Sequence, residues 1–225
     1  MRSLARWTPL SGIVFVALWI GSFVAVGGGV DTQNTDAAIR AYYADKAHRV
    51  REILAFFLLL AACAFFLWFL SVLSERIART SADNRTAARL AFGAGLVTTA
   101  AWIVAAGLWA VVADTIDESK FFVLDPNVYR LVNGLGYMIF VAGSTITLVL
   151  VASTSVAALR ARALPRWLGW VGLAVAASLT MAWTFVPFFA LLGWVVAVSI
   201  AQVWAPTAHA PVRADVQATP ATGPT

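Results

Sequence analysis

Residues 53–73 read ILAFFLLLAACAFFLWFLSVL and contain neither a charged side chain nor a histidine. A helix needs roughly 20 largely apolar residues to cross the hydrocarbon core of a bilayer, which is about 30 Å thick. The stretch is continuously apolar, whereas a strand of a transmembrane β-barrel alternates between apolar and polar residues. It therefore predicts an α-helix that spans a membrane.

The composition extends this prediction to the whole chain. Hydrophobic residues make up 61% of the 225 residues and charged residues 12%, against about 45–50% and about 25% in soluble domains. A soluble globular fold could not bury so much apolar surface. The single cysteine, Cys63, excludes a disulfide framework and a cysteine-based metal site.

Three more apolar stretches lie at 9–30, 90–112 and 131–156, and none contains Asp, Glu, Lys, Arg or His. Arg2 and Arg6 precede the first of them, which is a pattern that signal peptides share. This stretch is longer than the apolar part of a cleaved signal, however, and no clear small-residue cleavage site follows it. We therefore interpret 9–30 as a retained span.

The last apolar stretch, 167–204, runs for 38 residues without a charge. One helix of that length would be about 57 Å long, which is nearly twice the hydrocarbon thickness. Pro187 removes a backbone donor and disfavours helix at the residues before it, so we expect a tight hairpin of two spans at 167–185 and 188–205. The predicted fold is an all-α polytopic transmembrane bundle of six spans, with five spans as the alternative.

Arginine and lysine are divided unequally between the two sides of this bundle. Basic residues collect on the cytoplasmic side of membranes, so the side with more of them, which includes the N-terminus, is predicted to be cytoplasmic. Six basic residues share the other side with eight acids. The nine on the cytoplasmic side are Arg2, Arg6, Arg76, Arg79, Arg85, Arg89, Arg160, Arg162 and Arg166.

The net charge of +5 follows mostly from this bias and indicates attraction to anionic lipid headgroups. The predicted partner is therefore the lipid bilayer and not a nucleic acid. The C-terminal stretch 205–225 is rich in Pro, Ala and Thr, so we expect a disordered cytoplasmic tail.

The outer side carries a polar pattern before the second span. Asp36 can cap a short helix there. Four residues on one helical stripe follow, and they could form two ion pairs at i, i+4 spacing, Asp45 with Arg49 and His48 with Glu52. The second helix is therefore predicted to begin outside the membrane.

The fourth span has the clearest helix start in the chain. Asp125 is a suitable N-cap and Pro126 a suitable first residue. Following the helical period from there gives one polar face, made of Arg130, Asn133, Tyr137, Ser144 and Thr147.

These patterns have two interpretations. The simpler and favoured one is that the charges pair with neighbours and hold the helix ends together, while the hydroxyls join helices. The functional one is an outward-facing polar pocket for a small ligand, because arginine can hold a carboxylate or phosphate through two hydrogen bonds. The candidate ligand-binding residues are Tyr42, His48, Arg49, Glu52, Arg130, Asn133 and Tyr137.

Small residues predict positions where helices approach each other closely. Ala91 and Gly95 are four residues apart, as are Gly21 and Ala25, and Gly134, Gly136 and Gly143 lie in the fourth span. Such positions let helix backbones pack tightly in membranes.

The sequence lacks the motifs of common catalytic and metal sites. It has no HExxH, no Walker loop and no GxSxG, and neither of its two histidines has a second histidine or a cysteine at helical spacing. We therefore expect no cofactor, no metal and no catalytic residue. The favoured function is a small-ligand sensor or a subunit of a membrane protein partner. The alternatives are a small-solute transporter or channel and, last, an enzyme acting on lipid through Glu52, His48 or Asp114.

Residues 162–170, RALPRWLGW, resemble the LPRWLG loop that precedes the fifth helix in a widespread group of bacterial integral membrane proteins, catalogued as a domain of unknown function. The order of elements over about residues 10–200 is similar too, with an outer helix after the first span and an arginine, here Arg49, at the mouth of the second. The resemblance implies a helical bundle in a bacterial plasma membrane. It implies no activity.

Overall fold

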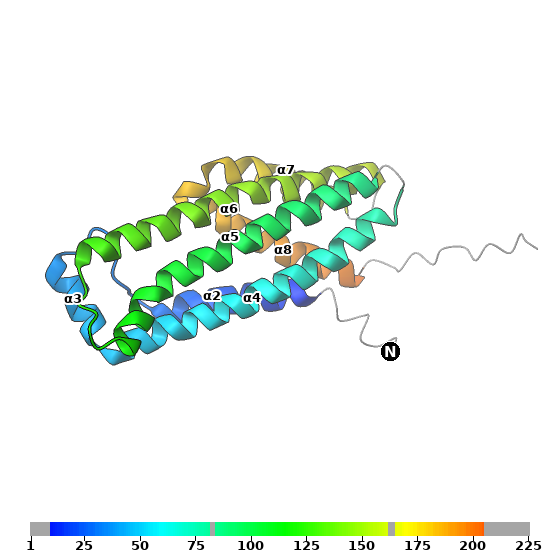
Figure 1. Cartoon of the computed structure of the whole chain (residues 1–225). Helices are drawn as coiled ribbons and strands as arrows, with labels where there is room; N and C mark the ends of the chain where they lie inside the picture. Colours follow the sequence, from blue (N-terminus) through cyan, green and yellow to red (C-terminus); the bar gives the residue numbers. More distant parts are fainter. Residues whose placement is uncertain (1–9, 82–83, 162–164, 205–225) are drawn as a thin grey trace, which may run out of the picture.

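The computed structural model describes residues 10–81, 84–161 and 165–204, and within these ranges it contains helices and no strand. The all-α prediction is therefore confirmed. The predicted tail at 205–225 lies outside the described residues, as do Arg2 and Arg6. The helices (Figure 1) are α2 (Ser11–Val26), α3 (Asp36–Ala44), α4 (Lys46–Ala78), α5 (Asn84–Glu118), α6 (Pro126–Ala161), α7 (Arg166–Ser178), the 3-10 helix η2 (Leu179–Thr184) and α8 (Val186–Trp204).

Five helical segments are long and apolar enough to cross a membrane, namely α4, α5, α6, α7 together with η2, and α8. This is the pattern of a membrane-embedded, multi-pass protein. Helix α2 is equally apolar but has only 16 residues, which corresponds to about 24 Å.

The predicted first span, 9–30, is wrong at its C-terminal end. Helix α2 ends at Val26, because Gly27 adopts a φ of 65° and its backbone N–H donates to the carbonyl of Phe23. Glycine has no Cβ and so adopts this left-handed region easily. The loop 27–35 that follows connects α2 to α3.

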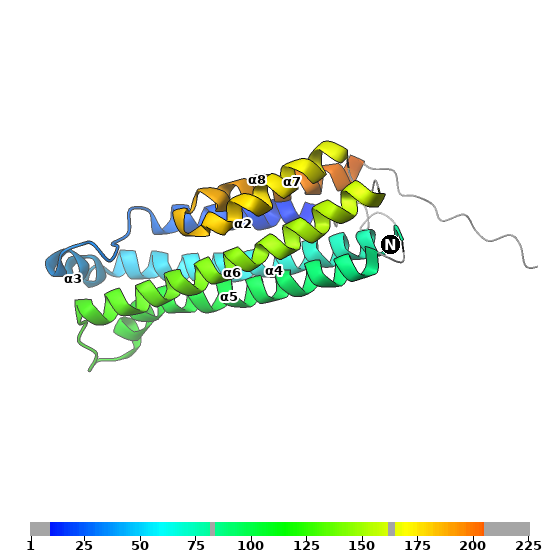
Figure 2. The same ribbon diagram turned by 90° about the horizontal axis from the view of Figure 1, so that it is seen from above.

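The six longer helices form a closed ring in which each helix packs on the next one in the chain. The order around the ring is α2, α4, α5, α6, α7 and α8, and α8 returns to pack on α2. Seen from above, α4, α5 and α6 lie on one side of the ring and α2, α7 and α8 on the other (Figure 2). Short α3 lies at one end of the bundle, where the loop from α2 leads (Figures 1 and 2).

The two sides of the ring differ in length. Helices α4, α5 and α6 have 33, 35 and 36 residues, or about 50–54 Å, while α2 and α8 have 16 and 19, or about 24–29 Å. Figure 2 shows that the α7–α8 hairpin stops short of the ends of α4 and α6 on the side of α3. At this end, the long helices therefore extend past the short ones.

The hairpin turns where the proline predicted it. Phe185 joins η2 to α8 with a φ of 61°, which places it in the left-handed region, and Pro187 is the second residue of α8. Because Pro187 cannot donate a backbone hydrogen bond, it is tolerated in the first turn of a helix but not in the middle of one. The 38-residue apolar stretch is therefore split into two helices.

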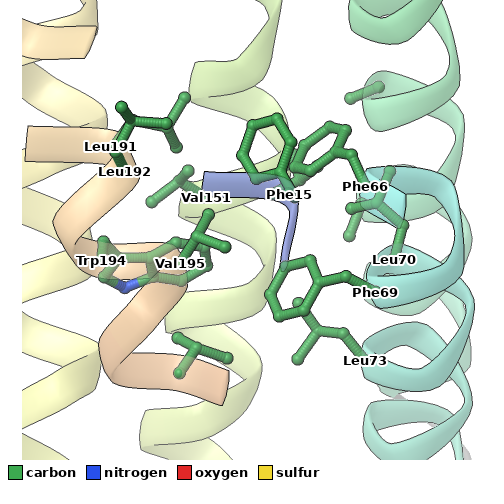
Figure 3. Close-up of a cluster of buried hydrophobic side chains, with 14 of the residues drawn as sticks. Phe15, Phe66, Phe69, Leu70, Leu73, Val151, Leu191, Leu192, Trp194 and Val195 are labelled. Atoms are coloured by element: carbon green, nitrogen blue, oxygen red, sulfur yellow. The ribbon is translucent and has the colours of Figure 1, made fainter. Parts of the chain in front are cut away.

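Aromatic side chains fill the centre of the helix bundle. Trp102 of α5 is fully buried. The centroid of its aromatic ring lies 5.4 Å from that of Phe66, 5.4 Å from that of Phe188 and 6.1 Å from that of Phe140. The same apolar cluster includes Phe15, Phe69 and Val195 (Figure 3). Side chains from five helices thus close the middle of the bundle.

Helices α5 and α6 are joined by hydrogen bonds in their buried halves. The hydroxyl of Thr98 donates to the carbonyl of Gly143, 3.1 Å away, and lies 3.0 Å from the hydroxyl of Thr147. The indole N–H of Trp102 donates to the hydroxyl of Ser144 over 3.1 Å. The hydroxyl-bearing part of the predicted polar face therefore joins two helices and lines no open space.

The small residues divide into close contacts and open positions. A Cβ built on Gly95 would lie 2.3 Å from a methyl carbon of Leu70, and one on Gly143 would lie 2.6 Å from the Cβ of Ala101. Nothing lies within 4 Å of such an atom at Gly21 or Gly134, whereas one on Gly136 would lie 2.7 Å from the indole nitrogen of Trp109. The predicted close packing is therefore confirmed at Gly95, Gly136 and Gly143 and wrong at Gly21 and Gly134.

Candidate functional site

A cavity of about 350 Å³ lies at the α3 end of the ring. Its walls come from the C-terminal part of α2 and the loop after it, and from the parts of α4, α5 and α6 that lie near α3. Phe185 at the tip of the α7–α8 hairpin completes them. The cavity lies where the long helices extend past the short ones. Tyr43 of α3 closes one side of it.

Glu52 of α4 is the central acid of the cavity. Its two carboxylate oxygens each lie 3.1 Å from the hydroxyl of Tyr43, which donates to them. Tyr43 is 3% exposed and belongs to α3, whose N-terminus is capped by the hydroxyl of Thr35. Among the described residues, no salt bridge reaches Glu52. The carboxylate therefore lies in a mostly apolar cavity without a basic partner.

The two neighbouring phenols of α3 stay protonated. Burial, followed by the nearby charge of Glu52, raises the pKa of both Tyr42 and Tyr43 far above the ordinary value of tyrosine. At neutral pH, Tyr43 is therefore a permanent donor to the carboxylate of Glu52.

Aromatic side chains make up much of the remaining wall. They come from α2, α4, α5, α6 and the hairpin tip, and they are Phe23, Phe56, Trp109, Tyr129, Tyr137 and Phe185. Two of the phenols hold the wall together instead of facing a ligand with a free donor. Tyr129 donates to the carbonyl of Val30 and accepts from the amide of Asn133, both over 2.6 Å, and Tyr137 donates to the carbonyl of Trp183.

The charged side chains that line the cavity are both acidic, namely Asp31 and Glu52, and no described Lys, Arg or His lines it. One carboxylate oxygen of Asp31 accepts hydrogen bonds from the backbone N–H groups of Gln33 and Asn34, at 2.7 and 3.1 Å. These two hydrogen bonds stabilise the loop that carries Asp31. Glu52, whose carboxyl receives a hydrogen bond from Tyr43, is the second acid with which a molecule in the cavity could pair.

The structure separates the seven predicted site residues into two groups. Glu52, Asn133 and Tyr137 line the cavity. The other four, Tyr42, His48, Arg49 and Arg130, do not line it and instead hold α3 and its loops in place.

The two predicted ion pairs at i, i+4 spacing are wrong. Asp45 is the N-cap of α4, and its carboxylate accepts from the backbone N–H of Ala47 over 2.8 Å. Arg49 instead binds Asp117 at the end of α5, through two nitrogens 2.8 and 2.7 Å from one carboxylate oxygen. Arg49 also donates to the carbonyl of Tyr43 over 2.5 Å, so it ties α3 to α4 and α5.

His48 and Tyr42 form a stacked pair beside the cavity. Their ring centroids lie 4.3 Å apart, and Nδ1 of His48 lies 3.2 Å from the carbonyl oxygen of Tyr42. This imidazole is therefore engaged with α3, and not with Glu52 as predicted.

Arg130 fastens the loop before α3 to the start of α6. Its guanidinium binds the carboxylate of Asp36 at 2.7 Å and the carbonyls of Asn34 and Thr32 at 2.9 and 3.2 Å. Asp36 is therefore an ion-pair partner, and the predicted cap of α3 is wrong because Thr35 caps that helix. The predicted start of α6 is confirmed, since Asp125 accepts from the N–H of Asn127 over 2.8 Å.

Several wall residues were not predicted from the sequence. Tyr129 lies four residues before Asn133 and directly before Arg130, so widening the polar face of α6 by one residue would have found it. Tyr43 is carried by a separate helix, and nothing in the local spacing links it to Glu52. Among the described residues, no group of three or more His, Cys, Asp and Glu side chains could hold a metal ion.

When the chain is compared with models of protein families, with curated proteins and with solved structures, none of the three comparisons gives a significant match.

Proposed function

We propose that this chain is a six-span protein of a bacterial plasma membrane, with its N-terminus in the cytoplasm, and that it binds a small ligand in the cavity at the α3 end. It acts as a sensor or as the ligand-binding subunit of a membrane complex. The bacterial location rests on the resemblance carried by residues 162–170.

Helix lengths and charges support this placement. The short helices α2 and α8, at about 24–29 Å, match a hydrocarbon core of about 30 Å. The end opposite α3 is rich in arginine, as a cytoplasmic side should be, with Glu75 as the one described acid. Its described basic residues are Arg76, Arg79, Arg85, Arg89, Arg160 and Arg166.

Single cysteines test the orientation and the sixth span together. In a Cys63→Ala background, we expect Phe121→Cys, in the exposed loop between α5 and α6, to react with an impermeant maleimide on intact cells. Ser3→Cys and Arg85→Cys should react only after the cells are opened. Labelling of Arg85→Cys from outside would reverse the orientation, and labelling of Ser3→Cys from outside would remove α2 from the spans.

The observation that carries the binding proposal is a cavity that lies between α3 and the fully buried aromatic core. It contains a carboxylate that has no basic partner, and it is bounded by residues from five helices. Trp102 and Phe140, both at most 1% exposed, pack in the middle of the ring. Because side chains fill the centre of the bundle, the structure supports a binding site more than a path for a solute. His48 and Asp114 lie outside the cavity lining, which weakens the case for an enzyme that acts on lipid.

Filling the cavity tests the proposal. Ala110 of α5 lines the cavity and is 6% exposed, so Ala110→Phe should occupy part of the space. We expect at least one of three small aromatic probes, benzyltrimethylammonium, benzyl alcohol or phenylacetate, to raise the Tm of the wild type by about 2–4 °C, since a ligand that binds only the folded state stabilises it. The filled variant should show no such rise.

A matched control uses the same helix and the same change. Ala100 of α5 is exposed, so Ala100→Phe should retain the response of the wild type. If Ala110→Phe does not fold, Val132→Phe fills the cavity from α6. Equal responses of wild-type and filled protein to all three probes, or no response to any of them, would reject the proposed binding function.

A further inference from the structure

We propose that the cavity selects an apolar cation, namely an amine or quaternary ammonium compound with an apolar body, and that Glu52 binds its positive charge. This inference rests on the proposed function, because it names the chemical class of the ligand that occupies the same cavity.

The first reason is the missing counter-ion of Glu52. Removing a carboxylate from water is costly unless it is paired with a positive charge and hydrogen-bonded. Tyr43 supplies the hydrogen bonds at 3.1 Å, but no described salt bridge supplies the charge. A cationic ligand would complete this arrangement.

The second reason is the wall around the acid. Phe56 lies one helical turn after Glu52 on α4, and Trp109 and Tyr129 face the same space from α5 and α6. Aromatic rings attract a cation through the negative potential of their faces, and they also cover its apolar body. The carboxyl of Glu52 with aromatic rings beside it is therefore complementary to an ammonium group with an apolar substituent, and Asp31, the second acid of the lining, also favours a cation.

The third reason is that the two arginines predicted to bind a ligand are engaged elsewhere. Arg49 is bound to Asp117, and Arg130 is bound to Asp36 and two backbone carbonyls. Neither lines the cavity. An anionic ligand would meet the charge of Glu52 without a compensating cation, so the cavity disfavours carboxylates and phosphates.

The size of the cavity limits the ligand to a small molecule. A volume of about 350 Å³ is at the lower end of the range for small-molecule sites. Benzyltrimethylammonium combines one quaternary nitrogen with one ring and fits this description. Benzyl alcohol and phenylacetate have a similar apolar body, but benzyl alcohol is uncharged and phenylacetate is negatively charged.

Calorimetric titration of these three probes into the full-length protein in lipid nanodiscs tests the inference. We expect benzyltrimethylammonium to bind at least tenfold more tightly than the other two. Glu52→Gln keeps the shape of the side chain and an acceptor for Tyr43 but removes the charge. It should therefore lower the affinity for benzyltrimethylammonium at least tenfold and change the affinity for benzyl alcohol less than twofold.

Two further variants separate charge recognition from an effect on folding. Glu75→Gln makes the same change on the same helix at the other end, where Glu75 is exposed and pairs with Arg79, and it should leave all three affinities unchanged. Phe56→Leu keeps apolar bulk but removes an aromatic ring. It should therefore lower only the affinity for the cation, by about threefold or more.

The outcomes distinguish the inference from the function on which it rests. If benzyl alcohol or phenylacetate binds as tightly as the cation, or if Glu52→Gln binds the cation within twofold of the wild type, the cation assignment is wrong and the binding function stands. If none of the probes binds, both the assignment and the proposed function fail.

Discussion

Replacing Trp102 with alanine is expected to lower the free energy of unfolding by about 3–5 kcal/mol, as for other large buried aromatic residues. Trp102 is fully buried and contacts the rings of Phe66, Phe140 and Phe188. In a bilayer the loss comes mainly from packing, because the cavity left behind removes dispersion contacts that lipid cannot replace. Unfolding in mixed micelles, followed by circular dichroism, measures the change.

Two variants set the scale for this result. Trp102→Phe keeps a ring but loses the N–H that donates to Ser144, so we expect a smaller loss of about 1–2 kcal/mol. Trp68 of α4 is 51% exposed, and Trp68→Ala should cost less than about 1 kcal/mol. If Trp102→Ala costs no more than Trp68→Ala, the aromatic cluster does not hold the ring of helices together.

Gly143→Ala is expected to destabilise the protein by about 1–3 kcal/mol through overpacking. The new Cβ would lie 2.6 Å from the Cβ of Ala101 and 3.4 Å from the carbonyl oxygen of Thr98. Neither atom can move by a side-chain rotation, so α5 and α6 must separate. The hydrogen bond from Thr98 to the carbonyl of Gly143 would lengthen as they do.

Gly134 on the same helix provides the matched control. Nothing lies within 4 Å of a Cβ built there, so Gly134→Ala should be neutral or stabilising by up to about 1 kcal/mol, because alanine favours helix over glycine. In the same unfolding assay, Gly143→Ala is thus expected to lower the free energy of unfolding, and Gly134→Ala to leave it unchanged or raise it. A stabilising Gly143→Ala would show that α5 and α6 are not in close contact at this position.

The helices themselves were predictable because they depend on local composition. A stretch without charge over roughly 20 residues has few alternatives to a membrane-spanning helix, and Pro187 marks the break within 167–204 for a steric reason that acts on its immediate neighbours. The end of α2 was not predicted correctly, because three successive glycines leave the position of the last helical turn open. Gly27 is the one that adopts the left-handed conformation.

The partners of the site residues were not predictable in the same way. Spacing along one helix suggested Asp45 for Arg49, but the carboxylate of Asp45 is used as the cap of α4. The observed partner, Asp117, is 68 residues away, and that of Arg130, Asp36, is 94 residues away. Such pairs depend on how helices are arranged in the ring, which periodicity within one helix does not contain.

The difference in length between the two sides of the ring has a consequence for how the cavity can change in evolution. The α7–α8 hairpin stops short of the ends of α4 and α6 (Figure 2), and Phe185 at its turn lines the cavity. Inserting one turn into each arm would advance the hairpin tip by about 5.4 Å and shrink the space, while the contacts between α4, α5 and α6 stay as they are. The volume of the cavity can therefore diversify through insertions in one hairpin, independently of the residues that stabilise the bundle.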